Sequence, residues 1–448
     1  MNSLHAASDD TRIPSTLLQV GAPRFWMAII CTGVAAGIGA VVLTRFLEIV
    51  QHFVWSGSGT HILQAAANAT PWRRITVLLG AGAIVGIGQL ILRRLSSGNG
   101  IEITSAIWFS AGRLPALRTL GSAVLSVIVV GMGASLGREG APKQAGAVFA
   151  NLISDKVRMS DEQRRLLVAC GAGAGMAAAY GVPLGGALFA LEVLRGILAL
   201  RLVLPALLAS LVATIISWIA LPNAPTYHIP PYSVSAGAFG LALIIGPIGG
   251  VVAVGYVRAV AWADRNRPEG WQRFAAPVLA LCILGIVSIK FPQLLGNGRD
   301  ISQLLFIGGV TSSTILLTLL VLKPTATVMC LVSGTPGGLF TPSLTLGALL
   351  GGILGHTASQ IGSGVPVGMC AVIGAGAMLA ATTQGPISAV VLMMELTGQA
   401  REFAAPMLLA VISSTLVSRM VEPRSIYEAR LSDEEVKNRL VTREQLAL

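Results

Sequence analysis

The stretch Gly137-Arg138-Glu139-Gly140-Ala141-Pro142 has a counterpart in outline 200 positions later, Gly337-Gly338-Leu339-Phe340-Thr341-Pro342. Both stretches are rich in glycine, and each is followed by a largely apolar run. The proline at the end of each stretch fits the first turn of a helix, where its missing N–H is not needed. Each stretch therefore predicts a break in the chain that leads into a helix N-terminus.

Two further landmarks repeat in the same order along the chain. Gly98-Asn99-Gly100-Ile101-Glu102-Ile103 returns as Gly296-Asn297-Gly298-Arg299-Asp300-Ile301 after 198 positions, and Glu192 returns as Glu395 after 203 positions. Landmarks in one order at a nearly constant offset indicate that the chain contains the same unit twice. Duplicated halves in a membrane protein favour a transporter or channel fold, with the binding site between the halves and built from broken helices. The spacing leaves open whether the halves are parallel or inverted.

The composition predicts an all-α polytopic membrane protein. Of 448 residues, 54% are hydrophobic and only 11% are charged, whereas a soluble domain carries roughly a quarter charged residues. Residues 25–44, 75–92 and 119–137 are uncharged and each is long enough to cross a bilayer. Residues 202–257 and 324–394 also lack Asp, Glu, Lys and Arg, and their many glycines and prolines indicate several segments each.

We divide the chain into four segments. Residues 1–24 form a polar N-terminal segment, residues 25–220 the first membrane repeat and residues 221–420 the second. Residues 421–448 form a C-terminal segment that carries Tyr427, and we expect no appended regulatory domain.

The charges and the chemistry-bearing residues argue against other classes of protein. The net charge of +11 comes mainly from short connectors, where Lys and Arg report membrane topology, so we expect no nucleic-acid partner. The five cysteines lie in apolar runs without the spacing of metal ligands. The chain contains no phosphate loop, no H-E-x-x-H and no Ser/His pairing, and the sequence predicts neither an enzyme nor a cofactor.

The two glycine-rich breaks predict an anion site. A helix N-terminus carries unpaired N–H groups and a positive partial charge, and unpaired donors are costly in hydrocarbon. An anion accepts from such donors, so two facing N-termini would bind one. Alternatively, the glycines only permit close helix packing, which is the interpretation that we favour for most of the 52 glycines in the chain.

Glu139 is the strongest candidate for a functional side chain, because an ionisable residue inside an apolar stretch is costly to bury. Its ionised carboxylate would occupy the N-terminal amides and block an external anion, and its protonated form would move away. Permeation would then depend on pH and on voltage. The alternative is a static ion pair with Arg138. Glu192 and Glu395 hold matched positions, which indicates a shared packing or helix-end role.

Gly137-Arg138-Glu139-Gly140, the stretch from Gly337 to Pro342 and Ser425-Ile426-Tyr427 together resemble the signature motifs of the CLC family of chloride channels and transporters, and the resemblance spans residues 25–427. Ala190-Leu191-Glu192-Val193-Leu194 is similar to the bacterial ClcB-type branch, which is voltage-gated. The resemblance implies two inverted-topology repeats with broken, tilted helices. It also implies a homodimer in the bacterial inner membrane, with chloride as the transported ion.

The resemblance also implies the roles of individual residues. Glu139 would be the gating glutamate, and the N–H groups of Leu339 and Phe340 would bind a central anion together with the Tyr427 hydroxyl. An outer anion site would be lined by the backbone at Arg138, Gly140 and Ala141.

The chain departs from the family pattern at two positions. Ser97-Gly98-Asn99-Gly100-Ile101-Glu102 stands where the family usually has Gly-Ser-Gly-Ile-Pro-Glu, so Asn99 takes the place of the anion-binding serine. Val193 stands where proton-coupled members carry an inner glutamate, and valine cannot relay protons. Val193 favours a gated chloride channel over a chloride/proton antiporter, and a secondary transporter of organic solutes is the less favoured third alternative.

Overall fold

A computed structural model describes residues 13, 21–55, 62–95, 102–309, 312–399, 403–431, 434 and 436–437. Within these residues the regular elements are helices, and the β-structure is one isolated bridge, so the predicted all-α class is confirmed. The helices of the N-terminal part are α2 (Ala22–Trp55), α3 (Ile62–Asn68), α4 (Pro71–Leu95), α5 (Ile103–Phe109), α6 (Ala116–Gly131), α7 (Gly140–Val157), α8 (Asp161–Tyr180), α9 (Pro183–Leu188), the π-helix η1 (Phe189–Arg195) and α10 (Leu200–Ser217). Those of the C-terminal part are α11 (Ala236–Arg265), α12 (Gln272–Val287), η2 (Pro292–Leu294), α13 (Arg299–Phe306), α14 (Ser313–Val332), α15 (Phe340–Gln360), α16 (Val367–Thr383), α17 (Pro386–Thr397), α18 (Ala404–Val421) and η3 (Glu428–Arg430).

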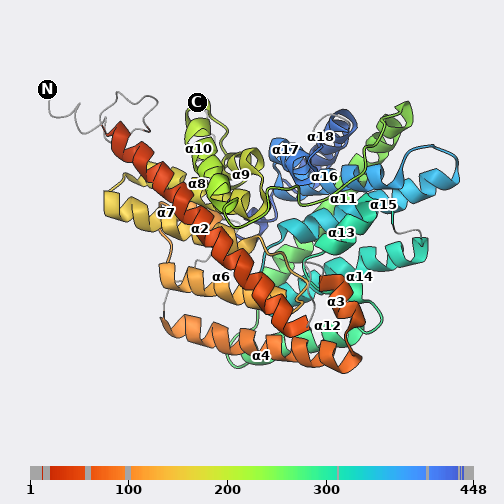
Figure 1. Ribbon diagram of the computed structural model, residues 1–448, viewed down its shortest axis with the longest axis horizontal. Coiled ribbons are helices and arrows are strands. Elements are labelled where there is room, and N and C mark those ends of the chain that lie inside the picture. The colour runs from red at the N-terminus through yellow and green to blue at the C-terminus, as the bar shows by residue number, and fades with distance from the viewer. Residues whose placement is uncertain are drawn as a thin grey trace.

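The element order repeats. Apart from α3, the helices α2 and α4 to α10 correspond in order to α11 to α18, with the short α5 and α13 in matching places. The packing repeats as well, because α7 packs on α8 as α15 packs on α16, and α2 packs on α10 as α11 packs on α18. Corresponding helices also meet each other, α4 with α12 and α9 with α17. In Figure 1 the pair α7 and α8 lies on the left and the pair α15 and α16 on the right.

The long helices are tilted and the inner ones approach closely. At about 1.5 Å per residue, the 34 residues of α2 span roughly 50 Å, more than the ~30 Å of a bilayer core, so α2 must cross at an angle. A Cβ atom at Gly146 of α7 would collide with the carbonyl of Gly171 in α8, and one at Gly347 of α15 would collide with that of Gly374 in α16. For these glycines the close-packing interpretation is confirmed.

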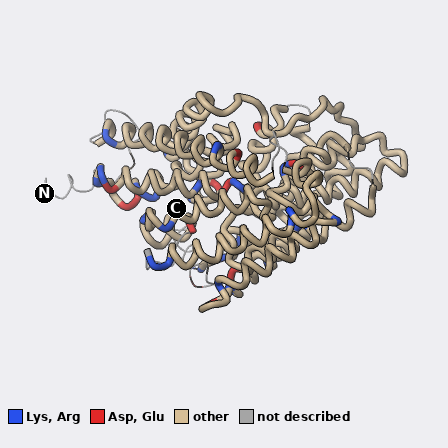
Figure 2. Tube along the Cα trace, turned by 60° about the horizontal axis from the view of Figure 1, so that its bottom comes forward, with Lys and Arg blue, Asp and Glu red and all other residues tan. Residues whose placement is uncertain are grey.

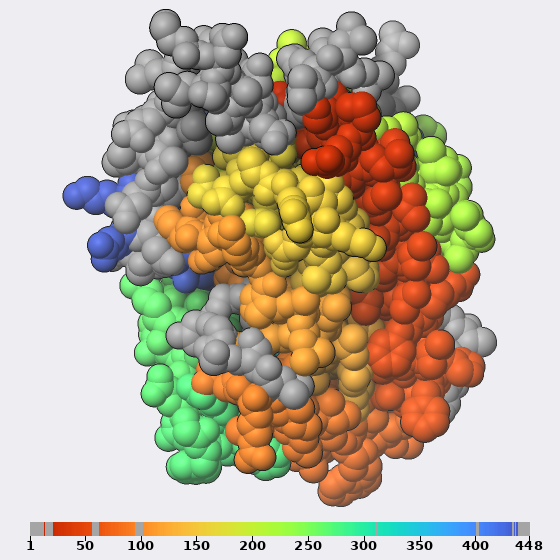
Figure 3. All heavy atoms as spheres, turned by 90° about the vertical axis from the view of Figure 1, so that its left-hand side faces the viewer, coloured from red at the N-terminus to blue at the C-terminus, as the bar shows by residue number. Residues whose placement is uncertain are grey.

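The outer surface is that of a multi-pass membrane protein. Among the described residues six helices are long and apolar enough to cross a membrane, namely α2, α4, α10, α11, α14 and α18. The charged residues are sparse along the tube in Figure 2. Figure 3 shows the face formed by α2, α4, α6, α7 and α8, and on α2 large apolar side chains such as Met27, Ile38 and Phe53 are exposed. Such a surface is suited to contact with lipid.

Two glutamates join the halves reciprocally. The Glu395 carboxylate, near the end of α17, accepts from the N–H of Gly185 at 2.6 Å and from that of the preceding residue at 3.0 Å, at the start of α9. The Glu192 carboxylate accepts from the N–H of Ser388 at 2.6 Å and from that of the preceding residue at 3.1 Å, at the start of α17. Each glutamate therefore caps a helix of the other half. The predicted helix-end role of both residues is confirmed.

Replacing either glutamate should destabilise the fold to a similar extent. In Glu192→Ala or Glu395→Ala two N–H groups at a helix start lose their acceptor, which costs about 0.5–2 kcal/mol for an ordinary N-cap. We expect both variants to unfold at lower temperature in detergent than the natural protein, measured by thermal unfolding. Glu269→Ala, an exposed glutamate in the α11–α12 connection, is the control and should leave the midpoint unchanged. Unchanged midpoints in both cap variants would contradict the capping role.

Candidate functional site

The two glycine-rich breaks are bonded to each other. The N–H of Gly137 donates to the carbonyl of Gly338 at 2.7 Å, and the N–H of Gly338 donates to the carbonyl of Gly137 at 2.8 Å. This antiparallel bridge brings together the chain segments that lead into α7 and α15. The N-termini of two corresponding helices therefore face one another. Repeats related by an axis along the membrane normal would point both helices the same way, so the halves are inverted.

The Glu139 side chain lies between these two helix starts and is fully buried. Glu139 is the residue before α7, yet its carboxylate does not cap α7. Instead Oε1 accepts from the N–H of Phe340 at 2.6 Å, and Oε2 accepts from the Thr341 hydroxyl at 3.2 Å. The carboxylate thus occupies the N-terminus of α15 as a bound anion would.

The static ion pair with Arg138 is not the arrangement in the structure, and that alternative is wrong. The guanidinium of Arg138 lies over the ring of Tyr180, 5.0 Å from its centroid. The hydroxyl of Tyr180 lies 3.1 Å from that of Thr341. Because the Thr341 proton goes to Glu139, Tyr180 is the donor to Thr341, and the two hydroxyls form a chain that supports the ionised carboxylate.

The glycines of the bridge leave the space that the carboxylate fills. A Cβ atom built at Gly137 or at Gly338 would overlap the carboxylate of Glu139. Any larger residue would push this group out of its position or separate the two segments. Positions 137 and 338 therefore require glycine as long as the Glu139 carboxylate lies between them.

A cavity of about 540 Å³, here called the wide vestibule, reaches the bridge from one side. Gly338, Leu339 and Tyr427 line it where it meets the site. Its charged lining is mostly basic and consists of Arg93, Arg118, Lys143, Arg267 and Arg430, with Glu102 and Asp264 as the acidic members. A concave surface of one dominant sign concentrates ions of the opposite charge, here anions.

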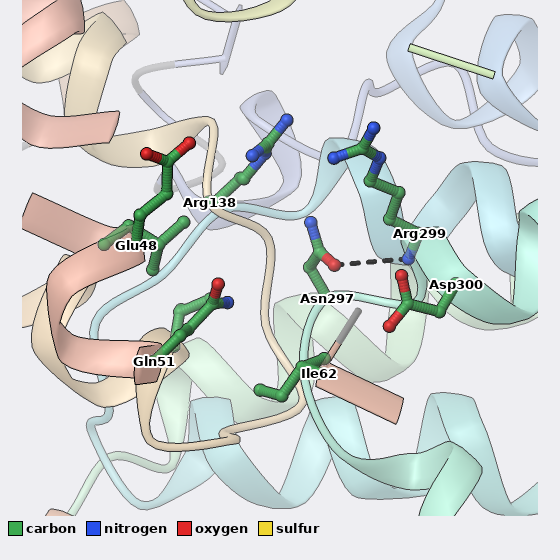
Figure 4. Close-up of a pocket in the computed structure, with 10 residues that line it drawn as sticks. Glu48, Gln51, Ile62, Arg138, Asn297, Arg299 and Asp300 are labelled. Carbon is green, nitrogen blue, oxygen red and sulfur yellow. Dashed lines mark hydrogen bonds between the residues drawn. The ribbon is translucent and has the colours of Figure 1, made fainter. Parts of the chain in front are cut away.

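A second, smaller cavity of about 40 Å³, here called the narrow pocket, is shown in Figure 4. Arg138 from the first half and Arg299 from the second line it, together with Glu48 and Asp300. Asn297, in the repeat of the Gly-Asn-Gly stretch, accepts through its side-chain oxygen from the N–H of Arg299 at 3.2 Å. Arg138 lines the narrow pocket and Gly140 the wide vestibule, so Glu139 stands at the boundary between the two cavities.

The structure brings most of the predicted site residues together. Gly140, Leu339 and Tyr427 line the wide vestibule, and the N–H of Phe340 is bonded to Glu139. Ala141 is buried in the first turn of α7. The remaining predicted residues are Arg138 at the narrow pocket, Val193 buried in η1, and Asn99, which lies outside the described residues.

The sequence did not predict three residues of the site, namely Lys143, Tyr180 and Thr341. Lys143 carried a readable signal, because it is a basic residue just before the apolar run that starts at Ala145. Tyr180 and Thr341 carried none, since a tyrosine or threonine in an apolar helix is common. Among the described residues no three His, Cys, Asp or Glu side chains gather as a metal site requires.

The comparison with known proteins agrees with this geometry. The family described as "Voltage gated chloride channel" matches residues 80–419. The chain belongs to this family, the CLC family. A ClcB-like chloride channel protein of Ralstonia nicotianae is 31% identical over 415 residues, 89% of this chain and 95% of the relative. The H(+)/Cl(-) exchange transporter ClcA of Vibrio campbellii is 26% identical over 439 residues, 91% of this chain and 90% of the relative.

Solved structures share the CLC fold. A slow cyanobacterial Cl-/H+ antiporter superimposes with a TM-score of 0.78 at 24% identity, covering 93% of this chain and 99% of that one. A CLC-type fluoride/proton antiporter superimposes with a TM-score of 0.73 at 21% identity, covering 91% of this chain and 98% of that one. The predicted fold of two inverted repeats with broken, tilted helices is confirmed, and the protein is a multi-pass member of an anion-transporting family.

Gly338→Ala should expel the Glu139 carboxylate from the α15 N-terminus, because the added methyl group occupies the same space. We expect an experimental structure of the variant to show the Glu139 side chain away from the N–H of Phe340. Gly255→Ala on α11, where a Cβ meets nothing within 4 Å, is the matched control and should leave the site unchanged. Retention of the Glu139–Phe340 hydrogen bond in Gly338→Ala would contradict the close-approach argument.

Proposed function

We propose that this CLC protein is a gated chloride pathway in which the Glu139 carboxylate competes with chloride for the N-termini of α7 and α15. The observation that carries the proposal is the hydrogen bond of 2.6 Å between Glu139 Oε1 and the N–H of Phe340. A carboxylate oxygen and a chloride ion accept from the same donors. The protein's own side chain therefore holds a position that suits a dehydrated anion.

The surroundings of Glu139 favour an anion on the side of the wide vestibule. Both helix starts present positive partial charge to the same point, and α7 begins without a side-chain cap from its preceding residue. Basic residues predominate in the lining of the wide vestibule, whereas in the narrow pocket Arg138 and Arg299 are matched by Glu48 and Asp300. Chloride would therefore be concentrated in the wide vestibule, next to a barrier made of one side chain.

Protonation is the proposed opening step. A neutral carboxyl group is a weaker acceptor than a carboxylate and loses its attraction to the two helix ends. Once protonated, the Glu139 side chain gives up the N–H of Phe340 and the Thr341 hydroxyl to chloride. Transport should therefore rise as pH falls, and movement of the charged side chain would also make it voltage-dependent.

Glu139→Ala should abolish the pH dependence of chloride efflux from liposomes. In the natural protein a single titrating group limits the rise to about tenfold per pH unit, and the variant has no group to titrate at this place. Glu139→Gln, which resembles the protonated side chain in shape, should behave in the same way. Glu269→Ala should keep the natural profile. If Glu139→Ala remains as pH-dependent as the natural protein, Glu139 is not the gate.

Passive conduction is the proposed mode of transport. Val193 occupies the position at which proton-coupled relatives carry a glutamate, and it lies buried in η1 with 3% of its surface exposed. Proton-coupled exchange is the second candidate. It is supported by the similarity to the exchange transporter ClcA and to solved antiporters.

Reversal potentials in planar bilayers or liposomes separate these two modes. For a channel the reversal potential follows the chloride gradient alone, and we expect no shift when a pH gradient is added. For an exchanger the potential moves with the pH gradient, because protons are carried in each cycle. A shift that grows in proportion to the pH difference would overturn the channel mode and leave the Glu139 site in place.

We further propose that the protein works as a homodimer in the bacterial inner membrane. The support is membership of the CLC family and similarity to bacterial relatives such as the ClcB-like protein of Ralstonia nicotianae. Crosslinking of the purified protein in lipid tests the dimer.

A further inference from the structure

Lys143 is a buried lysine that lines the wide vestibule beside Tyr427. It lies on α7, one turn after Glu139, and its N–H donates to the Glu139 carbonyl at 3.4 Å. Only 5% of its surface is exposed, and that surface lines the wide vestibule. Its ammonium lies 4.8 Å from the ring centroid of Tyr427 and 5.1 Å from that of Phe189. The two rings hold the ammonium in place by cation–π contacts.

The hydrogen bond from Lys143 fixes the role of the Tyr427 hydroxyl. The ammonium nitrogen lies 3.3 Å from the Tyr427 oxygen. In its ammonium form Lys143 has three donors and no acceptor, so the Tyr427 oxygen then accepts in this bond. Its own proton is then directed toward another group. Since Tyr427 lines the wide vestibule, that proton is available to an anion there.

The ammonium itself has donors left over. Within the described residues its hydrogen bond goes to Tyr427 alone, and no ion pair joins it to Glu139 or Glu102. Glu139 is bonded to Phe340 and Thr341, and Glu102 pairs with Arg430. A buried charge with one neutral hydrogen-bond partner is costly unless an ion of opposite sign joins it.

We propose that Lys143 is an anion-binding residue, and that its ammonium and the Tyr427 hydroxyl together bind chloride in the wide vestibule. This inference rests on the proposed chloride pathway. Leu339 also lines the cavity here, so the bound ion lies beside the start of α15. The fixed cation and the movable Glu139 carboxylate are one helical turn apart. Chloride at Lys143 is thus positioned to move onto the N–H of Phe340 when Glu139 leaves it.

Calorimetric titration of the purified full-length protein with chloride tests the proposal. In Lys143→Met, which keeps the length of the side chain without its charge, we expect the dissociation constant for chloride to rise about tenfold or more, the usual effect of losing a hydrogen bond to a charged group. Lys143→Arg should recover most of the affinity. Lys290→Met is the matched control, because Lys290 is exposed and lies over the Phe291 ring, 5.7 Å from its centroid. It should bind chloride like the natural protein.

Tyr427→Phe allows a second test, which distinguishes an anion-binding role of Lys143 from a merely structural one. If both residues hold the same ion, the effects of Lys143→Met and Tyr427→Phe on chloride affinity should be less than additive in the double variant. Additive effects would overturn the shared site.

The natural protein offers a test that does not depend on the folding of any variant. In crystals soaked with bromide, an anomalous peak should lie within hydrogen-bond reach of the Lys143 ammonium. A peak elsewhere in the pathway but none at Lys143, or unchanged affinity in Lys143→Met, would overturn this inference and leave the proposed function standing. Absence of chloride binding and of chloride efflux in the natural protein would overturn both.

Discussion

Two hydrogen bonds between Gly137 and Gly338 set the geometry on which the rest of the structure depends. They join the two glycine-rich breaks, so the helices α7 and α15 begin at nearly the same point from opposite directions. Helix starts present unpaired N–H groups and positive partial charge, and two of them facing each other inside a membrane would repel without an anion between them. Glu139 supplies that anion from within the chain. Because both bridge residues lack a side chain, the carboxylate fits where it does.

The inverted repeat extends this arrangement to the whole fold. Each half is incomplete at its own helix ends, since Glu192 caps α17 and Glu395 caps α9 across the axis. The halves therefore fix each other's position through charge-assisted hydrogen bonds, in addition to helix packing. The glycine contacts of α7 with α8, and of α15 with α16, bring the helix backbones into direct contact in the same way in both halves. The central site is held by rigid elements on both sides, which is what binding of a dehydrated ion requires.

The two ionisable groups on the first turns of α7 have opposite tasks in the mechanism that we propose. Glu139 is an anion that can be neutralised by one proton, and it occupies the end of α15. Lys143 is held by two aromatic rings and by the Tyr427 hydroxyl, with the basic wide vestibule beyond it. Because the two groups lie one turn apart, an anion bound at Lys143 can move to the N–H of Phe340 when the Glu139 carboxylate leaves it. Whether the N–H of Phe340 binds Glu139 or chloride then depends on protonation of Glu139 and not on a large rearrangement of helices.

The sequence by itself determined the membrane class, the duplication and the two breaks, and it singled out Glu139 as a candidate residue. These features follow from local sequence patterns, namely the length of uncharged runs, a proline at a helix start, and an acidic residue where hydrocarbon makes a charge costly. The spacing of the repeats left their orientation open, the resemblance implied inversion, and the facing starts of α7 and α15 confirm it. Only the tertiary structure decided that the Glu139 carboxylate binds Phe340 and not its own helix, and that Lys143 meets Tyr427. The partners in these contacts are separated by 201 and 284 positions. No local pattern specifies them, because the partner of a buried charge is whichever group the packed helices bring within reach.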